Sequence, residues 1–256
     1  MTNVIGLVWL ILLAVALSII QRKLHFETQA IFLLLTRRRE IALVLFSIMF
    51  LPGIILHECS HYLMARLLGV RTGRFSIIPR PRANGRLQLG FVETASTDIF
   101  RDALIGFSPL LIGSAFVIYA GMNPLGLSVL WEAIRYEEIG IIWKVIISLP
   151  SATDFWLWFY LTLAVSSTMF PSASDRRAWF PVGIFFAVLL ILFILLNLVL
   201  GFHENFKSLI IYFNRGIQVV VLILAVSTIV HGLTFPLAWL IRNLLMNMKG
   251  KRLSIV

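Results

Sequence analysis

Two long uncharged runs constrain this chain more than any other feature of its sequence. Residues 178–202 and 216–240 are each 25 residues long, and neither contains Asp, Glu, Lys or Arg. A helix of about 20 apolar residues spans the hydrocarbon core of a bilayer. The whole composition agrees, because 59% of the residues are hydrophobic and 13% are charged, against about a quarter charged in an average soluble domain. A soluble globular fold is therefore excluded.

The sequence predicts an all-α polytopic membrane protein with about six transmembrane helices. The expected spans are residues 4–20, 41–70, 103–120, 155–170, 179–201 and a last one from about residue 217. The short apolar stretch 30–36 is expected to lie in the membrane interface, next to Arg37, Arg38 and Arg39. Segment 121–153 mixes Trp, Glu and Lys with apolar residues, which predicts amphipathic interfacial helices.

Segment 71–101 differs in composition from the predicted spans around it. It holds six Arg, alternates apolar residues at Leu87, Leu89 and Phe91, and contains Asn84-Gly85. Asn-Gly favours the tight turn whose twist matches that of paired strands. We therefore expect a small β-hairpin insertion at the membrane surface.

The charge balance points to lipid contact. The chain has 22 Lys and Arg against 12 Asp and Glu, a net charge of +10, and the basic residues fall in short clusters between spans. Such clusters report membrane topology and anionic lipid, so nucleic acid is not indicated as a partner. The expected location is an integral multi-pass position, in the cell membrane. A single cysteine, Cys59, excludes an internal disulfide.

The segment His57-Glu58-Cys59-Ser60-His61 is the motif that carries chemistry. It has the pattern His-Glu-x-x-His inside a predicted membrane helix, where two His four residues apart share one face and can bind one zinc ion. Glu58 is offset by about 100° around the helix and can act as a general base toward a water. A pair of bonded core histidines is the alternative, but a carboxylate and two imidazoles at membrane depth are costly without a function. Cys59 and Ser60 are interpreted as packing residues.

A zinc site of this kind needs a third protein ligand. The candidates near membrane depth are Asp154, Asp175, His203 and His231. Asp175 follows Pro171, which ends a helix and allows the chain to turn back. Asp175 can equally be the N-cap of the next helix, and His231 is the second choice as ligand.

These features together resemble the site-2 protease family of intramembrane zinc metalloproteases. The resemblance rests on the His-Glu-x-x-His pattern in a membrane helix, the basic hairpin after it and a later Pro-containing motif with an Asp. It implies a three-span metalloprotease core at about 41–180, including the hairpin at 71–101. Residues 1–40 then form a first transmembrane helix and an interfacial segment, and 181–256 form C-terminal helices with a basic tail.

The family resemblance implies Zn²⁺ held by His57, His61 and an Asp, with Glu58 as the catalytic general base. The expected function is hydrolysis of a peptide bond in or near a transmembrane segment of another membrane protein. The family's Asp motif typically reads Asn-x-x-Pro, four residues, then Asp-Gly. Here Thr168 replaces the Asn, Asp175 comes one residue early and Arg176 replaces the Gly.

Two other classes of function remain open at the level of sequence. The altered Asp motif favours a non-proteolytic subunit that keeps the fold and acts in assembly or packing of a larger membrane complex, while the intact Glu58 argues against it. A metal-ion transporter would need ionisable residues staggered along several spans, and the last two predicted spans contain almost none. Rhomboid-like, presenilin-like and prenyl-protein proteases fit less well, because their characteristic residues are missing from the expected positions.

Overall fold

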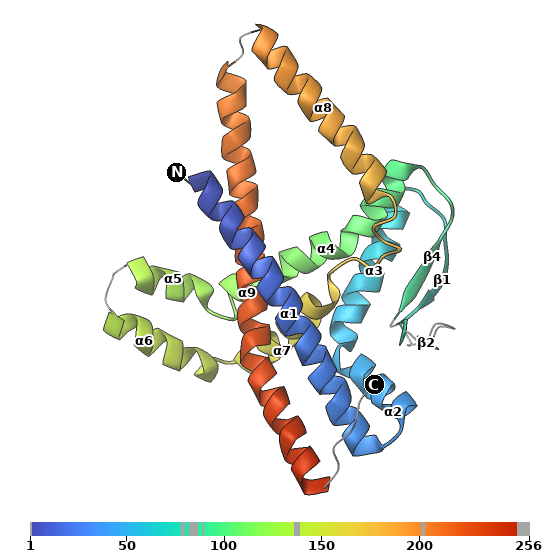
Figure 1. Cartoon of the computed structure of the whole chain (residues 1–256), viewed down its shortest axis with the longest axis vertical. Coiled ribbons are helices and arrows are strands. Elements are labelled where there is room, and N and C mark those ends of the chain that lie inside the picture. The colour runs from blue at the N-terminus through green and yellow to red at the C-terminus, as the bar shows by residue number, and fades with distance from the viewer. Residues whose placement is uncertain are drawn as a thin grey trace.

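The structure, a computed structural model, describes residues 2–77, 80–81, 87–88, 90–135, 139–200 and 203–249. Over these ranges the chain is mostly helical, as expected, with short strands beside one end of the bundle (Figure 1). The strands lie next to α3 (Leu51–Leu67), the helix that carries the His-Glu-x-x-His motif, and α4 (Ile99–Met122) follows the last strand along the chain.

The two longest helices pack along each other. They are α1 (Thr2–Thr36) and α9 (His203–Lys249), which cross the molecule side by side in Figure 1. The sequence predicted a first span ending near residue 20 and a separate interfacial segment, but α1 continues through Thr36. Residues 21–36 contain no Gly or Pro, so nothing interrupts the backbone hydrogen bonds of the helix.

The predicted second span is broken into two helices. α2 (Arg39–Met49) and α3 meet at Phe50 with a bend of 71°. Pro52 lies in the first turn of α3, where its missing N–H is tolerated, although the same residue prevents α2 from continuing straight. The Pro52-Gly53 pair thus places the His-Glu-x-x-His motif on a helix of its own.

α4 begins at a well-formed cap and carries an internal proline, Pro109. The side chain of Asp98 accepts hydrogen bonds from the backbone N–H groups of Phe100 and Arg101 at 3.1 and 3.0 Å. This cap satisfies N–H groups that have no partner inside the helix. The cap also fixes the start of the helix that packs most closely on α3.

The predicted hairpin region forms short antiparallel strands. β1 (Thr72–Ser76) pairs with β4 (Phe91–Thr94), and β2 (Arg80–Pro81) pairs with β3 (Leu87–Gln88). The expected Asn84-Gly85 turn lies outside the described residues. The location of the hairpin at a membrane surface stays a prediction.

The remaining helices follow α4 along the chain. They are α5 (Leu127–Arg135), α6 (Ile139–Ser148), a 3₁₀ turn (Leu149–Ser151), α7 (Phe155–Thr168) and α8 (Trp179–Leu200). Three helices of the described chain are long and apolar enough to cross a membrane, or up to five if each of two bent helix pairs is one span. A multi-pass membrane protein is therefore supported, while the number six stays a prediction.

The core lies where α1, α2, α3, α7 and α9 meet. Its main buried cluster contains Leu24, Phe46, Phe50, Ile54, Leu125, Leu163, Ala164, Val230 and Ala238. Gly53 allows α3 to approach α7 closely, because a Cβ atom there would collide with the carbonyl oxygen of Ala164 and with Oγ1 of Thr168. This close approach brings the motif helix beside the chain that follows α7.

Candidate metal centre

His57 and His61 lie on one face of α3, as their spacing predicted. Their Nε2 atoms are 3.2 Å apart, and the rings meet edge to face with centroids 4.9 Å apart. Both side chains are largely buried, with 13% and 10% of their surfaces exposed. Two ring nitrogens therefore point at the same small volume.

A backbone carbonyl fixes the orientation of His61. Nδ1 of His61 donates a hydrogen bond to the carbonyl oxygen of Ile105 in α4 at 2.8 Å. Because a carbonyl oxygen only accepts, the proton of the neutral ring lies on Nδ1 and the lone pair lies on Nε2. Ser108 donates to the same carbonyl oxygen at 2.7 Å. Such a partner on the far ring nitrogen is usual for a histidine that binds a metal.

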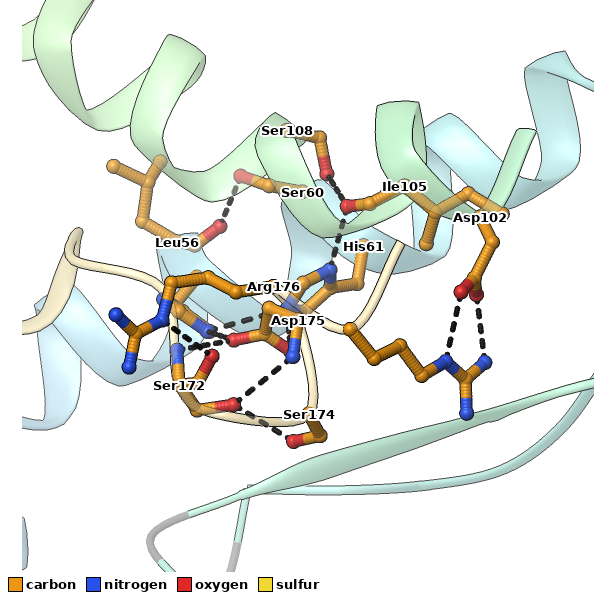
Figure 2. A network of polar contacts seen from close by, with 12 residues as sticks. Leu56, Ser60, His61, Asp102, Ile105, Ser108, Ser172, Ser174, Asp175 and Arg176 are labelled. Carbon is orange, nitrogen blue, oxygen red and sulfur yellow. Dashed lines mark hydrogen bonds and ion pairs between the residues drawn. The ribbon is translucent and has the colours of Figure 1, made fainter. Parts of the chain in front are cut away.

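Asp175 meets both histidines from the segment between α7 and α8. Its Oδ1 lies 3.4 Å from Nε2 of His61, and its Oδ2 lies 3.7 Å from Nε2 of His57. The backbone N–H of Ser172 donates to Oδ2 at 2.7 Å (Figure 2). Asp175 thus turns back into the bundle, four residues before α8 begins at Trp179.

The carboxyl group of Asp175 is held in its charged form. Burial by itself raises the pKa of this group, but its contacts with His57 and Ser172 and the charge of His61 outweigh that effect. Together they lower the pKa to about 2. An ionised carboxylate is the form that binds a metal ion.

The three donor groups fit zinc in kind and in spacing. One ligand atom from each of His57, His61 and Asp175 lies within 4.8 Å of the other two. Ligand atoms around a tetrahedral zinc ion at about 2.0–2.1 Å are separated by roughly 3.3 Å, and the three pairs of side chains here approach to 3.2, 3.4 and 3.7 Å, the longest being His57 to Asp175. Two imidazoles and a carboxylate also leave a fourth position open, as catalytic zinc sites do.

Glu58 lies under the strand region. It is 8% exposed, and its side chain contacts the backbone of Gly90, immediately before β4. A Cβ atom at Gly90 would lie 2.7 Å from Cγ and 2.8 Å from Oε1 of Glu58. Gly90 escaped notice in the sequence, because the collision depends on how the hairpin folds back over α3.

The other candidate ligands lie elsewhere. Asp154 directly precedes α7, at the opposite end from the segment that carries Asp175, and has a left-handed backbone with φ 62°. The side chain of His203 lies outside the described residues. His231 is fully buried in α9, where Nδ1 donates to the carbonyl oxygen of Ser227 at 2.8 Å. Its Nε2 accepts from the hydroxyl of Ser167 at 2.9 Å.

The two residues between the ligand positions have structural surroundings. Ser60 is buried, and its hydroxyl donates to the carbonyl oxygen of Leu56 one turn earlier. Cys59 is a free, partly exposed cysteine. Neither side chain is paired with a base in the hydrogen bonds of the described chain, and the packing role expected from the sequence stays a prediction.

Comparison with protein-family models, with curated proteins and with solved structures finds no match to this chain.

Proposed function

We propose that this protein is an intramembrane zinc metallopeptidase of the site-2 protease type. The observation that carries the proposal is the convergence of His57, His61 and Asp175, whose ligand atoms lie within 4.8 Å of one another. These residues come from segments more than a hundred positions apart in the sequence, yet they form a donor set suited to zinc. The adjacent Glu58 supplies the one further group that peptide hydrolysis at such a site requires.

The residues have separate roles in this proposal. When bound, zinc polarises the scissile carbonyl and lowers the pKa of a water. Glu58 accepts the proton of the attacking water and later returns it to the leaving amine. Ile105 keeps His61 in the tautomer whose Nε2 faces the centre. The backbone at Gly90 and the surrounding helices keep bulk water away from Glu58.

The proposed substrate is a transmembrane segment of another protein that becomes locally extended. A helical segment keeps its peptide groups hydrogen-bonded, so hydrolysis requires local unwinding. β1 and β4 pair with each other, and Gly90, directly before β4, contacts the side chain of Glu58. The two strands therefore lie close to the proposed general base. An extended segment can add to such a sheet as a further strand. We propose that six helices span the cell membrane and that the hairpin lies at the membrane surface.

One observation favours the alternative of a non-proteolytic subunit in a membrane complex. The position that is Asn in the family motif is Thr168, whose hydroxyl bonds to the carbonyl oxygen of Ala164 within its own helix at 3.0 Å. The hydroxyl of Thr168 therefore donates its hydrogen bond within α7 and not to a substrate. A subunit of this kind would keep the metal and the fold without cleaving peptides.

Metal content tests the proposed centre. Full-length protein purified in detergent without chelators is expected to carry about one zinc per chain by elemental analysis. The double variant His57→Ala, His61→Ala removes two of the three ligands and is expected to lose the zinc while keeping its helical content. His25→Ala, which changes a half-buried histidine in α1 next to Phe46 and Phe50, is the matched control. Equal zinc in wild type and the double variant would contradict the assignment.

A further inference from the structure

One turn at the start of α4 contacts both parts of the candidate metal centre. At residue 105 its carbonyl oxygen binds His61, which belongs to α3. At residue 102 its side chain binds Arg177, which belongs to the segment that carries Asp175. Figure 2 shows Asp102 and Ile105 along the same helix, with His61 and Asp175 beside it. A single rigid element therefore touches the helix with two ligands and the segment with the third.

The pair of Asp102 and Arg177 is bidentate. Nε of Arg177 donates to Oδ2 of Asp102 at 2.7 Å, and Nη2 donates to Oδ1 at 2.6 Å. The planar guanidinium matches the carboxylate, so the pair fixes direction as well as distance. The side chain of Arg177 is 64% exposed, and exposed ion pairs contribute little to folding stability. The pair fixes the position of the chain relative to α4 at Arg177, two residues after Asp175.

Gly106 brings the backbone of Asp175 against the same turn. The three heavy atoms nearest to a Cβ at Gly106 are the carbonyl oxygen, the carbonyl carbon and Cα of Asp175. No side chain fits between α4 and this peptide group. The ligand residue is therefore seated on α4 through its own main chain.

The hydrogen bonds within the segment do not replace this attachment. The backbone N–H of Ser172 binds Oδ2 of Asp175 at 2.7 Å, and Ser172 Oγ accepts from the N–H of Asp175 at 3.4 Å. These bonds orient the carboxylate relative to its own segment. They move with the segment, so they do not fix its distance from His57 and His61.

We propose that Arg177 and Asp102 are positioning residues of the metal centre. Their pair holds the segment on α4, so that the carboxylate of Asp175 reaches the two histidine nitrogens in one coordination sphere. The inference rests on the metal centre proposed above and adds two residues to it. It also accounts for Arg177 in a segment where the family motif is otherwise altered.

Metal affinity of three variants tests the pair. Arg177→Gln, Asp102→Asn and the double variant are compared with wild type as full-length protein in detergent, by competition of Zn²⁺ and Co²⁺ against a chromophoric chelator. Each single variant is expected to lose about 10- to 100-fold in affinity, the usual effect of removing a group that orients a ligand. The double variant is expected to lose no more than either single variant, because both changes break the same pair.

The visible absorption of bound Co²⁺ separates positioning from general stability. This spectrum reports ligand geometry, so it is expected to change in Arg177→Gln at saturating Co²⁺. Arg177→Lys keeps the charge without the fork and is expected to recover part of the affinity. Arg101→Gln is the matched control, because Arg101 in α4 pairs at 3.2 Å with Asp98, the residue that caps this helix, and not with the segment that carries Asp175. It is expected to bind both ions as wild type does.

The outcomes distinguish this inference from the proposal beneath it. A wild type that binds neither ion contradicts the metal centre itself. A wild type that binds both ions, with unchanged affinity and spectrum in Arg177→Gln and Asp102→Asn, overturns the positioning role alone. Additive losses in the double variant would show that the two residues do not act as a pair. Helical content and melting temperature are measured on each preparation, and Asp102→Asn with Arg177→Lys decides the question if Arg177→Gln does not fold.

Discussion

The backbone of Gly90 lies against the carboxylate side chain of Glu58, with room for a hydrogen but not for a methyl group. A Cβ atom at position 90 would lie 2.8 Å from Oε1 of Glu58. Gly90 is buried and directly precedes β4. The strand region thus covers the proposed general base. The absence of a side chain at position 90 leaves Glu58 room for its observed position.

Gly90→Ala is expected to reduce peptide cleavage strongly while zinc stays bound. The added methyl group displaces either Glu58 or the chain before β4, and a misplacement of about 1 Å can cost roughly 100-fold in rate. The ligands on α3 and after α7 are not touched by this change. Cleavage of a reconstituted transmembrane substrate and zinc content are measured on the same preparation.

Gly73→Ala is the control for that experiment. Gly73 lies in β1, and a Cβ there would meet the side chain of Glu93, 3.0 Å from its Oε2. Oε2 is the far end of a flexible side chain and can move aside, and the Cβ of Glu93 at 3.2 Å has to give by only a few tenths of an ångström, so activity is expected to remain near that of wild type. Equal activity in Gly90→Ala and wild type would show that the contact with Glu58 has no part in catalysis.

Asp175→Ala and His231→Ala are expected to affect different properties: the first lowers zinc affinity and the second lowers folding stability. Asp175→Ala removes the third donor and lowers zinc affinity at least as much as the roughly 10- to 100-fold typical of losing an orienting partner. His231→Ala leaves the hydroxyl of Ser167 without its acceptor inside the bundle, so it lowers stability, by about 0.6 to 2 kcal/mol. Zinc titration and thermal unfolding separate the two effects. Loss of zinc only in His231→Ala would reassign the third ligand.

The contact between α3 and α7 predicts a strong effect of Gly53→Ala. A Cβ at this position collides with the carbonyl oxygen of Ala164, and a backbone atom cannot move aside as a side chain can. Overpacking of this kind costs about 1 to 3 kcal/mol. Gly216→Ala in α9 is the control, because nothing lies within 4 Å of a Cβ there. Thermal unfolding in detergent should show a lower midpoint for Gly53→Ala alone.

Local sequence patterns predicted much of the helical fold and the two histidines of the candidate site. The helical spacing placed His57 and His61 on one face, whereas 41–70 was expected as one span and the structure breaks it between α2 and α3, next to Pro52-Gly53. The continuous α1 was not anticipated, because the polar residues after position 20 were interpreted as the end of a span. Polar residues such as Arg22 and Lys23 do not end a helix. The backbone hydrogen bonds of α1 continue past them to Thr36, because no Gly or Pro interrupts this stretch.

The rest of the site depends on distant contacts. Asp175 lies 114 positions after His61, and its approach to the histidines follows from the packing of α3, α4 and α7. On sequence alone a ligand and an N-cap were equally good interpretations of this residue. The bonds that hold Ser167 to Gln21 and His231 have the same character. No local pattern encodes a hydrogen bond between separate helices.

The most direct test of the metallopeptidase mechanism is Glu58→Gln, assayed for cleavage and zinc on one preparation. Glutamine nearly matches glutamate in size, so the fold and the zinc content are expected to stay unchanged. It cannot accept the proton, and general-base catalysis contributes about 10²- to 10⁴-fold, so cleavage of a reconstituted transmembrane substrate containing Gly or Pro is expected to disappear. Cleavage by zinc-loaded Glu58→Gln at the wild-type rate would contradict the mechanism.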